Sequence, residues 1–169
     1  MKNVEILKAI ILRADRHAEH NLRLSLFTSD GVRIVYAIGA LKPTAKLKGA
    51  LQLFNVVELS LTGTRVTGAH LLQSSMGLTK DIDRLYLMSA ISDAVLKLVN
   101  EGEDNSTIYD IIVQSQELLS ATDTSTTNVF IHFFGGLLAI LGYGIEEETV
   151  TAIKRAYIEH LDYNITTKI

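Results

Sequence analysis

The chain has 169 residues, of which 47% are hydrophobic and 21% are charged, a composition that excludes a disordered protein. It contains no cysteine, which excludes disulfides, thiolate metal sites and a cysteine nucleophile. The net charge of −3 divides into +6 for residues 1–80 and −9 for residues 81–169, so we expect a polyanionic partner for the first half only.

The N-terminal apolar stretch is interrupted by Glu5 and Lys8, so it lacks the hydrophobic region of a signal peptide. No apolar run reaches the roughly 18–20 residues that cross a bilayer. We therefore expect a soluble, cytoplasmic protein with no membrane partner.

Short β-branched and alternating apolar segments dominate the first 74 residues. They predict five strands, at residues 6–12, 22–27, 32–39, 52–61 and 65–72. A basic loop over residues 42–49 separates the third strand from the fourth, and Pro43 keeps Lys42 out of helical geometry. Five short antiparallel strands in a basic segment indicate a small barrel of the OB type.

The turn between the second and third strands is predicted to be a three-residue loop over 29–31, with Gly31 in the left-handed position. This register places Leu24 opposite Tyr36 and Leu26 opposite Ile34 on the core side. It places Phe27 opposite Arg33, with Arg23, Phe27 and Arg33 on the outward face.

After Gly77 the apolar spacing becomes helical. We predict a helix that is capped by Thr79 and ends within 100–102, and further helices over 106–119, 128–141 and 146–163. The third helix is apolar on most faces and is expected to be the buried centre of a bundle. The predicted fold class is α+β, with an OB-fold-like basic domain at 1–76 and an acidic helical domain at 77–169.

Four segments, in this order, resemble the bacterial DNA repair and recombination mediator family RecO. They are the opening strand at 7–13, the second strand and its turn at 22–31, the segment at 48–59 that leads into the fourth strand, and Leu141-Gly142-Tyr143 at the end of a Phe-rich helix. The resemblance implies a protein that binds single- and double-stranded DNA and helps complementary strands to anneal. It also implies that, with the partner RecR, the protein loads recombinase onto DNA coated by the single-stranded DNA-binding protein SSB.

The chain departs from that family in two respects. The family commonly carries a cysteine-containing, zinc-ribbon-like segment after the Leu-Gly-Tyr helix, whereas here residues 155–161 resemble the family's last helix and follow almost directly. We therefore expect a short form without the zinc-binding segment. The loop after the third strand is also less basic than is usual in the family.

Basic residues of the first half are the candidate DNA-binding set, because phosphate neutralisation needs cations along a groove. With Phe27 as a possible base-stacking side chain, the set comprises Arg13, Arg16, Arg23, Phe27, Arg33, Lys42, Lys46, Lys48 and Arg65. The alternative for Phe27, which we favour for that residue alone, is that it packs under the helical domain.

For the other polar residues we favour a structural or solvent-exposed role over a binding site. Asp15, His17, Glu19 and His20 resemble a metal site, but a solvated loop is the better interpretation. Glu146, Glu147 and Glu148 are expected to begin a helix, where acids interact favourably with the helix dipole. His132 is interpreted as a core or groove histidine, and the negative second half opposes docking of the acidic SSB tail.

No catalytic constellation, phosphate-binding glycine motif, metal set or cofactor motif is present in the sequence. The function that the sequence favours is a non-enzymatic, RecO-type DNA-binding mediator. The alternative is an OB-type protein-interaction adaptor with little or no DNA affinity, which the less basic loop favours.

Overall fold

The computed structural model describes residues 3–100, 103–121, 123–167 and 169. The chain divides into two compact units, Met1–Ser75 and Met76–Ile169. No helix in the described ranges is both long enough and apolar enough to cross a membrane.

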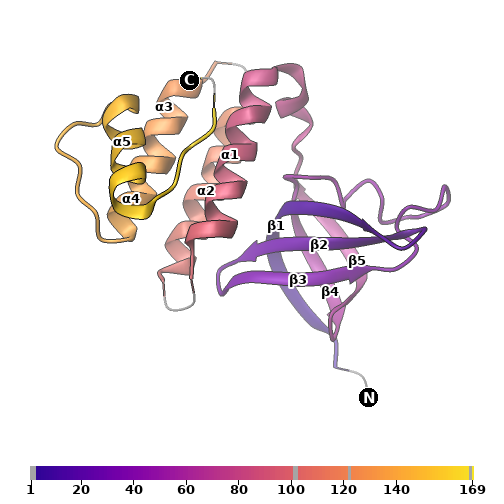
Figure 1. Cartoon of the computed structure of the whole chain (residues 1–169). Helices are drawn as coiled ribbons and strands as arrows, with labels where there is room; N and C mark the ends of the chain where they lie inside the picture. The colour runs from indigo at the N-terminus through magenta and orange to yellow at the C-terminus, as the bar shows by residue number, and fades with distance from the viewer. Residues whose placement is uncertain (1–2, 101–102, 122, 168) are drawn as a thin grey trace. The chain divides into compact units, whose positions relative to one another are not determined.

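The first unit is a closed five-stranded barrel with strand order β1-β2-β3-β5-β4 (Figure 1). Its strands are β1 (Glu5–His17), β2 (Asn21–Thr28), β3 (Gly31–Ala37), β4 (Val56–Thr62) and β5 (Arg65–Gln73). Four of the pairings are antiparallel, and the barrel closes through a parallel contact between β3 and β5 at Tyr36 and Arg65. This confirms the predicted OB-like barrel.

The barrel core consists of alternate residues of the strands, together with two positions in the loop between β3 and β4. These residues are Ala9, Ile11, Leu22, Leu24, Leu26, Val35, Ala37, Ala40, Leu51, Val57, Leu59, Leu61 and Val66. Each of these side chains is 9% exposed or less. Because successive strand residues point to opposite faces, the strand residues next to them point away from the barrel core.

The predicted register of the β2–β3 hairpin is wrong by one residue. Leu24 lies opposite Val35 and Phe27 opposite Val32, so Ser29 and Asp30 form a two-residue loop closed by the pair Thr28 and Gly31. The Thr28 hydroxyl stabilises this tighter loop, because it donates a hydrogen bond to the Gly31 carbonyl at 3.0 Å and accepts one from the Asp30 N–H at 3.1 Å.

The second unit is helical, as predicted. It contains the 3₁₀ turn η1 (Met76–Lys80), α1 (Ile82–Leu98), α2 (Asn105–Ser120), α3 (Thr126–Phe130), the π-helical turn η2 (Ile131–Gly135), α4 (Gly136–Ile140) and α5 (Val150–Leu161). The elements α3, η2 and α4 together occupy the predicted Phe-rich helix. Phe130, Phe133, Phe134, Leu137 and Leu138 are buried there, which confirms that this segment forms the centre of the bundle.

Three helix ends differ from the prediction. Asp81, not Thr79, caps α1, because its carboxylate accepts a hydrogen bond from the Asp83 N–H at 2.9 Å. The helix α1 ends at Leu98, and residues 101–102 of the predicted stop lie outside the described residues. The helix α5 begins at Val150 with Thr149 as its cap, so the acids at 146–148 precede the helix and do not form its first turn.

Candidate nucleic-acid interface

One row of outward-facing side chains crosses four strands of the barrel. Asp15 on β1 pairs with Arg23 on β2, Arg23 pairs with Tyr36 on β3, and Tyr36 pairs with Arg65 on β5. Directly paired residues project from the same side of a sheet, with Cβ atoms about 4.5–5.5 Å apart in antiparallel pairs. We refer to Asp15, Arg23, Tyr36 and Arg65 as the outer row.

The core positions beside the outer row fix its orientation. Tyr36 lies between the buried residues Val35 and Ala37, and Arg23 lies between Leu22 and Leu24. Successive strand residues point to opposite faces, so both side chains point away from the core. Arg65 precedes the core residue Val66 and is exposed.

A β-bulge between Ile11 and Arg13 adds a further cation to this face. Odd-numbered residues of β1 face the core up to Ile11, whereas after the bulge Ala14 packs against the core. Because a bulge inserts one residue, it exchanges the faces of the strand beyond it. Arg13, Asp15 and His17 therefore all point outward. Asp15 belongs to the outer row, and Arg13 and His17 lie on either side of it along β1.

The cations of this face differ in how far acids neutralise them. Arg23 Nη1 lies 3.8 Å from Asp15 Oδ2, and both side chains are substantially exposed, at 39% and 50%. Arg13 and Arg65 are exposed, and neither has an acidic partner within ion-pair distance in the described part of the chain. These two arginines are consequently the most available to an external anion.

The outer row also contains an aromatic contact that sequence reasoning missed. The ring of Tyr36 lies against that of His17, with centroids 5.1 Å apart and the planes tilted by 54°. Tyr36 is half-buried, whereas His17 is exposed. A polar-tipped aromatic at this position was detectable only with the correct hairpin register, because the one-residue slip places Tyr36 on the core side.

Two predicted site residues belong to the barrel's own framework. Arg33 lies opposite Leu26, on the inner side of the sheet, and donates two hydrogen bonds to the Glu5 carboxylate, at 2.9 and 3.1 Å. The guanidinium holds the pKa of Glu5 below its ordinary range, chiefly through these hydrogen bonds. Phe27 follows the core residue Leu26 and pairs with Val32, so it faces away from the barrel core, as predicted. It is fully buried there, which leaves it no free ring face for base stacking.

The remaining predicted cations lie outside the outer row. Arg16 pairs with Leu22 and so projects from the core side of β1, where it is exposed. Lys42, Lys46 and Lys48 are exposed in the loop between β3 and β4. That loop begins near the end of the β1–β2 hairpin, because the Leu41 N–H donates to the His20 carbonyl and the Gly39 N–H donates to the Asn21 side chain, both at 2.9 Å.

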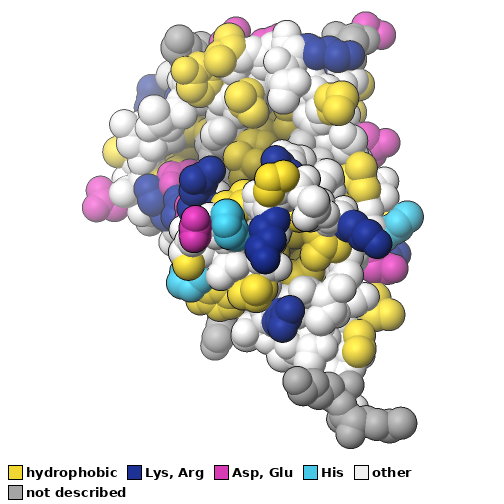
Figure 2. All heavy atoms as spheres, turned by 90° about the vertical axis from the view of Figure 1, so that its right-hand side faces the viewer, with side chains coloured by type: hydrophobic (Ala, Val, Ile, Leu, Met, Phe, Trp, Pro, Cys, Tyr) yellow, Lys and Arg dark blue, Asp and Glu magenta, His cyan; other side chains and the backbone are white. Residues whose placement is uncertain are grey.

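The face drawn in Figure 2 does not carry a continuous basic patch. Figure 2 shows separate Lys and Arg side chains interspersed with apolar, acidic and histidine side chains on one face of the molecule. On this face, positive charge is therefore carried by separate side chains with other residue types between them.

In the described part of the chain, Asp15, His17, Glu19 and His20 do not form a metal site, and the first two lie in β1 and not in the predicted loop. No group of three or more His, Asp or Glu side chains is placed there to hold a metal ion. Asp15 instead lies against Arg23, and His17 against Tyr36. His132 is exposed and contacts the Gln114 side chain at 3.1 Å. Of the two predicted places for it, core or groove, the core is therefore wrong.

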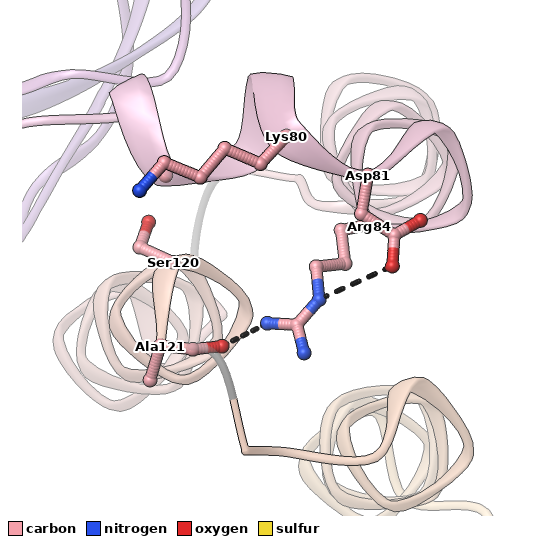
Figure 3. A pocket seen from close by; sticks show the side chains of 6 residues that line it. Lys80, Asp81, Arg84, Ser120 and Ala121 are labelled. Carbon is pink, nitrogen blue, oxygen red and sulfur yellow. Dashed lines mark hydrogen bonds and ion pairs between the residues drawn. The ribbon is translucent and has the colours of Figure 1, made fainter.

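A pocket of about 200 Å³ in the helical unit is lined by Gly77, Lys80, Asp81, Arg84, Ser120 and Ala121 (Figure 3). Its most buried cation, Arg84, donates to the carbonyls of Leu119, Ala121 and Thr124 and lies 3.5 Å from the Asp81 carboxylate. With the guanidinium engaged in this way, Arg84 connects α1 to the end of α2. The residues of this pocket therefore hold α1 against the end of α2, and the Arg84 guanidinium is not available to a phosphate.

A closed barrel with this strand order, joined to a helical unit, defines a two-unit protein of the OB-barrel class. The first unit matches the family model described as Recombination protein O N terminal, over residues 1–75. The second matches Recombination protein O C terminal, over residues 79–151. The chain belongs to the RecO family.

Relatives named DNA repair protein RecO support this membership. The protein of Gloeobacter violaceus is 29% identical over 86% of this chain and 58% of its own length. The protein of Desulforudis audaxviator is 31% identical over 82% of this chain and 57% of its own length. The protein of Chlorobium limicola is 22% identical over 80% of this chain and 55% of its own length. The chain thus spans little more than half the length of these relatives.

Proposed function

We propose that the chain is a non-catalytic DNA-binding protein that binds single- and double-stranded DNA through the outer row and its flanking cations. The observation that carries this proposal is the in-register placement of Arg23, Tyr36 and Arg65 across β2, β3 and β5. Strands 2 and 3 and the adjoining loops form the usual nucleic-acid face of an OB barrel. The exposed cation Arg13 extends this face onto β1.

Strand annealing follows physically from such a surface. Two complementary strands repel each other through their phosphates, and cations that neutralise both backbones release counterions and allow close approach. The second half of the chain carries −9 and would limit spreading along DNA. We propose that the protein promotes annealing in this way during DNA repair.

Recombinase loading would require protein partners, and we propose a RecR-like partner by family membership. Docking of an acidic SSB tail has weaker support, because several cations of the helical unit are already engaged. Arg84 is held by carbonyls and Asp81, Lys97 lies 3.1 Å from Asp93, and Lys154 is bound to the carbonyls of Thr167 and Ile169. An acidic tail would thus find few available positive charges on this unit.

The proposal is tested by fluorescence anisotropy of labelled single-stranded and duplex oligonucleotides, titrated with the wild-type chain from low to physiological salt. We expect micromolar or tighter binding at low salt that weakens as salt rises, because each neutralised phosphate contributes about 0.7–0.9 to the logarithmic salt slope. A strand-annealing assay with complementary labelled oligonucleotides, and a pull-down with a RecR-like protein, then test the two further steps.

A second candidate function is a protein-interaction adaptor of the OB type. The ion pairs of Arg23 with Asp15 and of Arg33 with Glu5 favour it, because they reduce the positive charge available to DNA. The absence of DNA binding even at low salt would support the adaptor and contradict the DNA-binding proposal.

A further inference from the structure

We infer that Tyr36, supported by His17, is a base-stacking side chain that makes the outer row selective for unpaired bases. The inference rests on the proposed function, which assigns DNA to this face, and adds strand selectivity and the residue responsible for it. The ligand class is single-stranded DNA with exposed bases.

The position of Tyr36 suits stacking because cations lie on both sides of it. Arg23 on β2 and Arg65 on β5 are its direct cross-strand neighbours. Phosphates on either side of a nucleotide could contact these two guanidinium groups while the base between them reaches the tyrosine ring. Aromatic residues between backbone-contacting cations are the recurring arrangement of single-strand binding surfaces.

The aromatic surface is larger than one ring. His17, from β1, lies against Tyr36 with a centroid separation of 5.1 Å, and its own ring is exposed. The contact restricts the orientation of Tyr36, so less rotamer entropy is lost when a base packs against it. The backbone of Tyr36 is held in β3, and its side chain is half-buried, which restricts it further.

Selectivity follows from the geometry of paired bases. In a duplex the base faces are stacked on one another, and a protein side chain reaches only their edges and the backbone. An unpaired base offers a free face, and stacking on an aromatic side chain is sequence-tolerant because every base has one. Arg13, Arg23 and Arg65 would then supply affinity for either form of DNA, and Tyr36 the preference for the single strand.

The test uses the full chain and three probes of equal length: an oligothymidylate, the same backbone with abasic sugars, and a duplex. We expect the wild type to bind the base-bearing strand about fivefold or more tightly than the abasic strand, which corresponds to the lower end of measured stacking effects. Tyr36→Leu should remove this difference, whereas Tyr36→Phe should retain it. The salt slope on the abasic strand should be unchanged in both variants.

Tyr86→Leu is the matched control, because Tyr86 is an exposed tyrosine on α1 outside the outer row. Equal binding of base-bearing and abasic strands by the wild type, or undiminished discrimination by Tyr36→Leu, would overturn the inference while salt-dependent binding still supported the proposed function. A wild type that binds none of the three probes would overturn both. The wild-type comparison needs no variant, so a folding defect in Tyr36→Leu cannot obscure the result.

Discussion

Arg33 shows that an arginine of a basic barrel can serve the fold instead of a ligand. Its bidentate contact with Glu5 joins β3 to the start of β1, and both residues lie on the core side of their strands. We predict that Arg33→Ala leaves the salt slope of DNA binding unchanged but lowers the Tm of the chain. Anisotropy and thermal unfolding measure the two effects.

The same pair predicts a pH dependence. Because the folded state lowers the pKa of Glu5, the ion pair contributes stability above the ordinary glutamate pKa of about 4.3, and this is lost as pH falls through the lower, folded-state pKa. The Tm difference between wild type and Arg33→Ala should therefore be largest near neutral pH and vanish in acid. A difference that persists after Glu5 is protonated would contradict the ion-pair explanation.

Gly77 is required by close packing within the helical unit. A Cβ built on Gly77 would lie 2.5 Å from the Ser120 carbonyl oxygen and 2.9 Å from its Cα, both backbone atoms that cannot rotate away. We predict that Gly77→Ala lowers the free energy of unfolding by about 1–3 kcal/mol, the usual cost of overpacking.

Urea denaturation measures that change, with Gly144→Ala as the control. A Cβ on Gly144 would meet no atom within 4 Å, so this second substitution should have little effect. Equal stability of the two variants would show that the backbone around Ser120 adjusts at low cost.

At the scale of single elements, the segment after α5 is held by Tyr163. The Tyr163 hydroxyl donates to the Asp93 carboxylate of α1 at 2.7 Å, and Ile165 beyond it is buried. We predict that Tyr163→Phe lowers the free energy of unfolding by about 1.5–3 kcal/mol, as expected for the loss of a hydrogen bond to a charged acceptor. Tyr143→Phe is the matched control, because it keeps the Tyr143 ring that stacks on His160.

Chemical denaturation at several pH values gives a second readout for Tyr163. Burial, together with the bond to Asp93, raises the pKa of Tyr163, so its contribution is complete below the ordinary tyrosine pKa of about 10 and declines as pH rises above it. Part of the loss of stability in alkali should therefore be absent from Tyr163→Phe. Identical alkaline profiles for the two proteins would contradict this assignment.

The strands and helices were largely predictable, because apolar alternation in 22–27 and 3.6-residue spacing after Gly77 follow directly from burial on one face. The β2–β3 register was not predictable in the same way, since both loop lengths bury apolar residues. The choice depended on the Thr28 side chain, whose two hydrogen bonds stabilise the two-residue loop. That slip of one residue placed Tyr36 inside the barrel and Arg33 outside it, the reverse of what the structure shows.

The orientation of Arg13 depended on a second local feature. Strict alternation from Ile11 would point residue 13 toward the core, and only the bulge between Ile11 and Arg13 turns it outward. Single-residue bulges leave no composition signal, so Arg13 could be proposed on charge alone but not placed. The ion pair between Arg33 and Glu5 could not be predicted either, because the two residues are 28 positions apart and only the barrel topology brings them together.

At the scale of the whole molecule, the division of charge matches the division of the fold. Residues 1–80 carry +6 and residues 81–169 carry −9, and the two compact units meet in sequence at Ser75 and Met76. A polyanion is attracted to one unit and repelled by the other, so DNA affinity should depend on the basic unit's exposed arginines and should be strongly screened by salt.

The most direct test of this account compares two charge-matched double variants in single-stranded DNA binding across a salt series. Arg13→Ala with Arg65→Ala removes two exposed cations from the outward face, whereas Lys80→Ala with Arg155→Ala removes two exposed cations of the helical unit. The account predicts that the first pair weakens binding and lowers the logarithmic salt slope by about 0.7 for each phosphate that is no longer neutralised, while the second pair has a much smaller effect. Equal weakening by the two variants, or none by the first, would contradict the assignment of DNA to this face of the barrel.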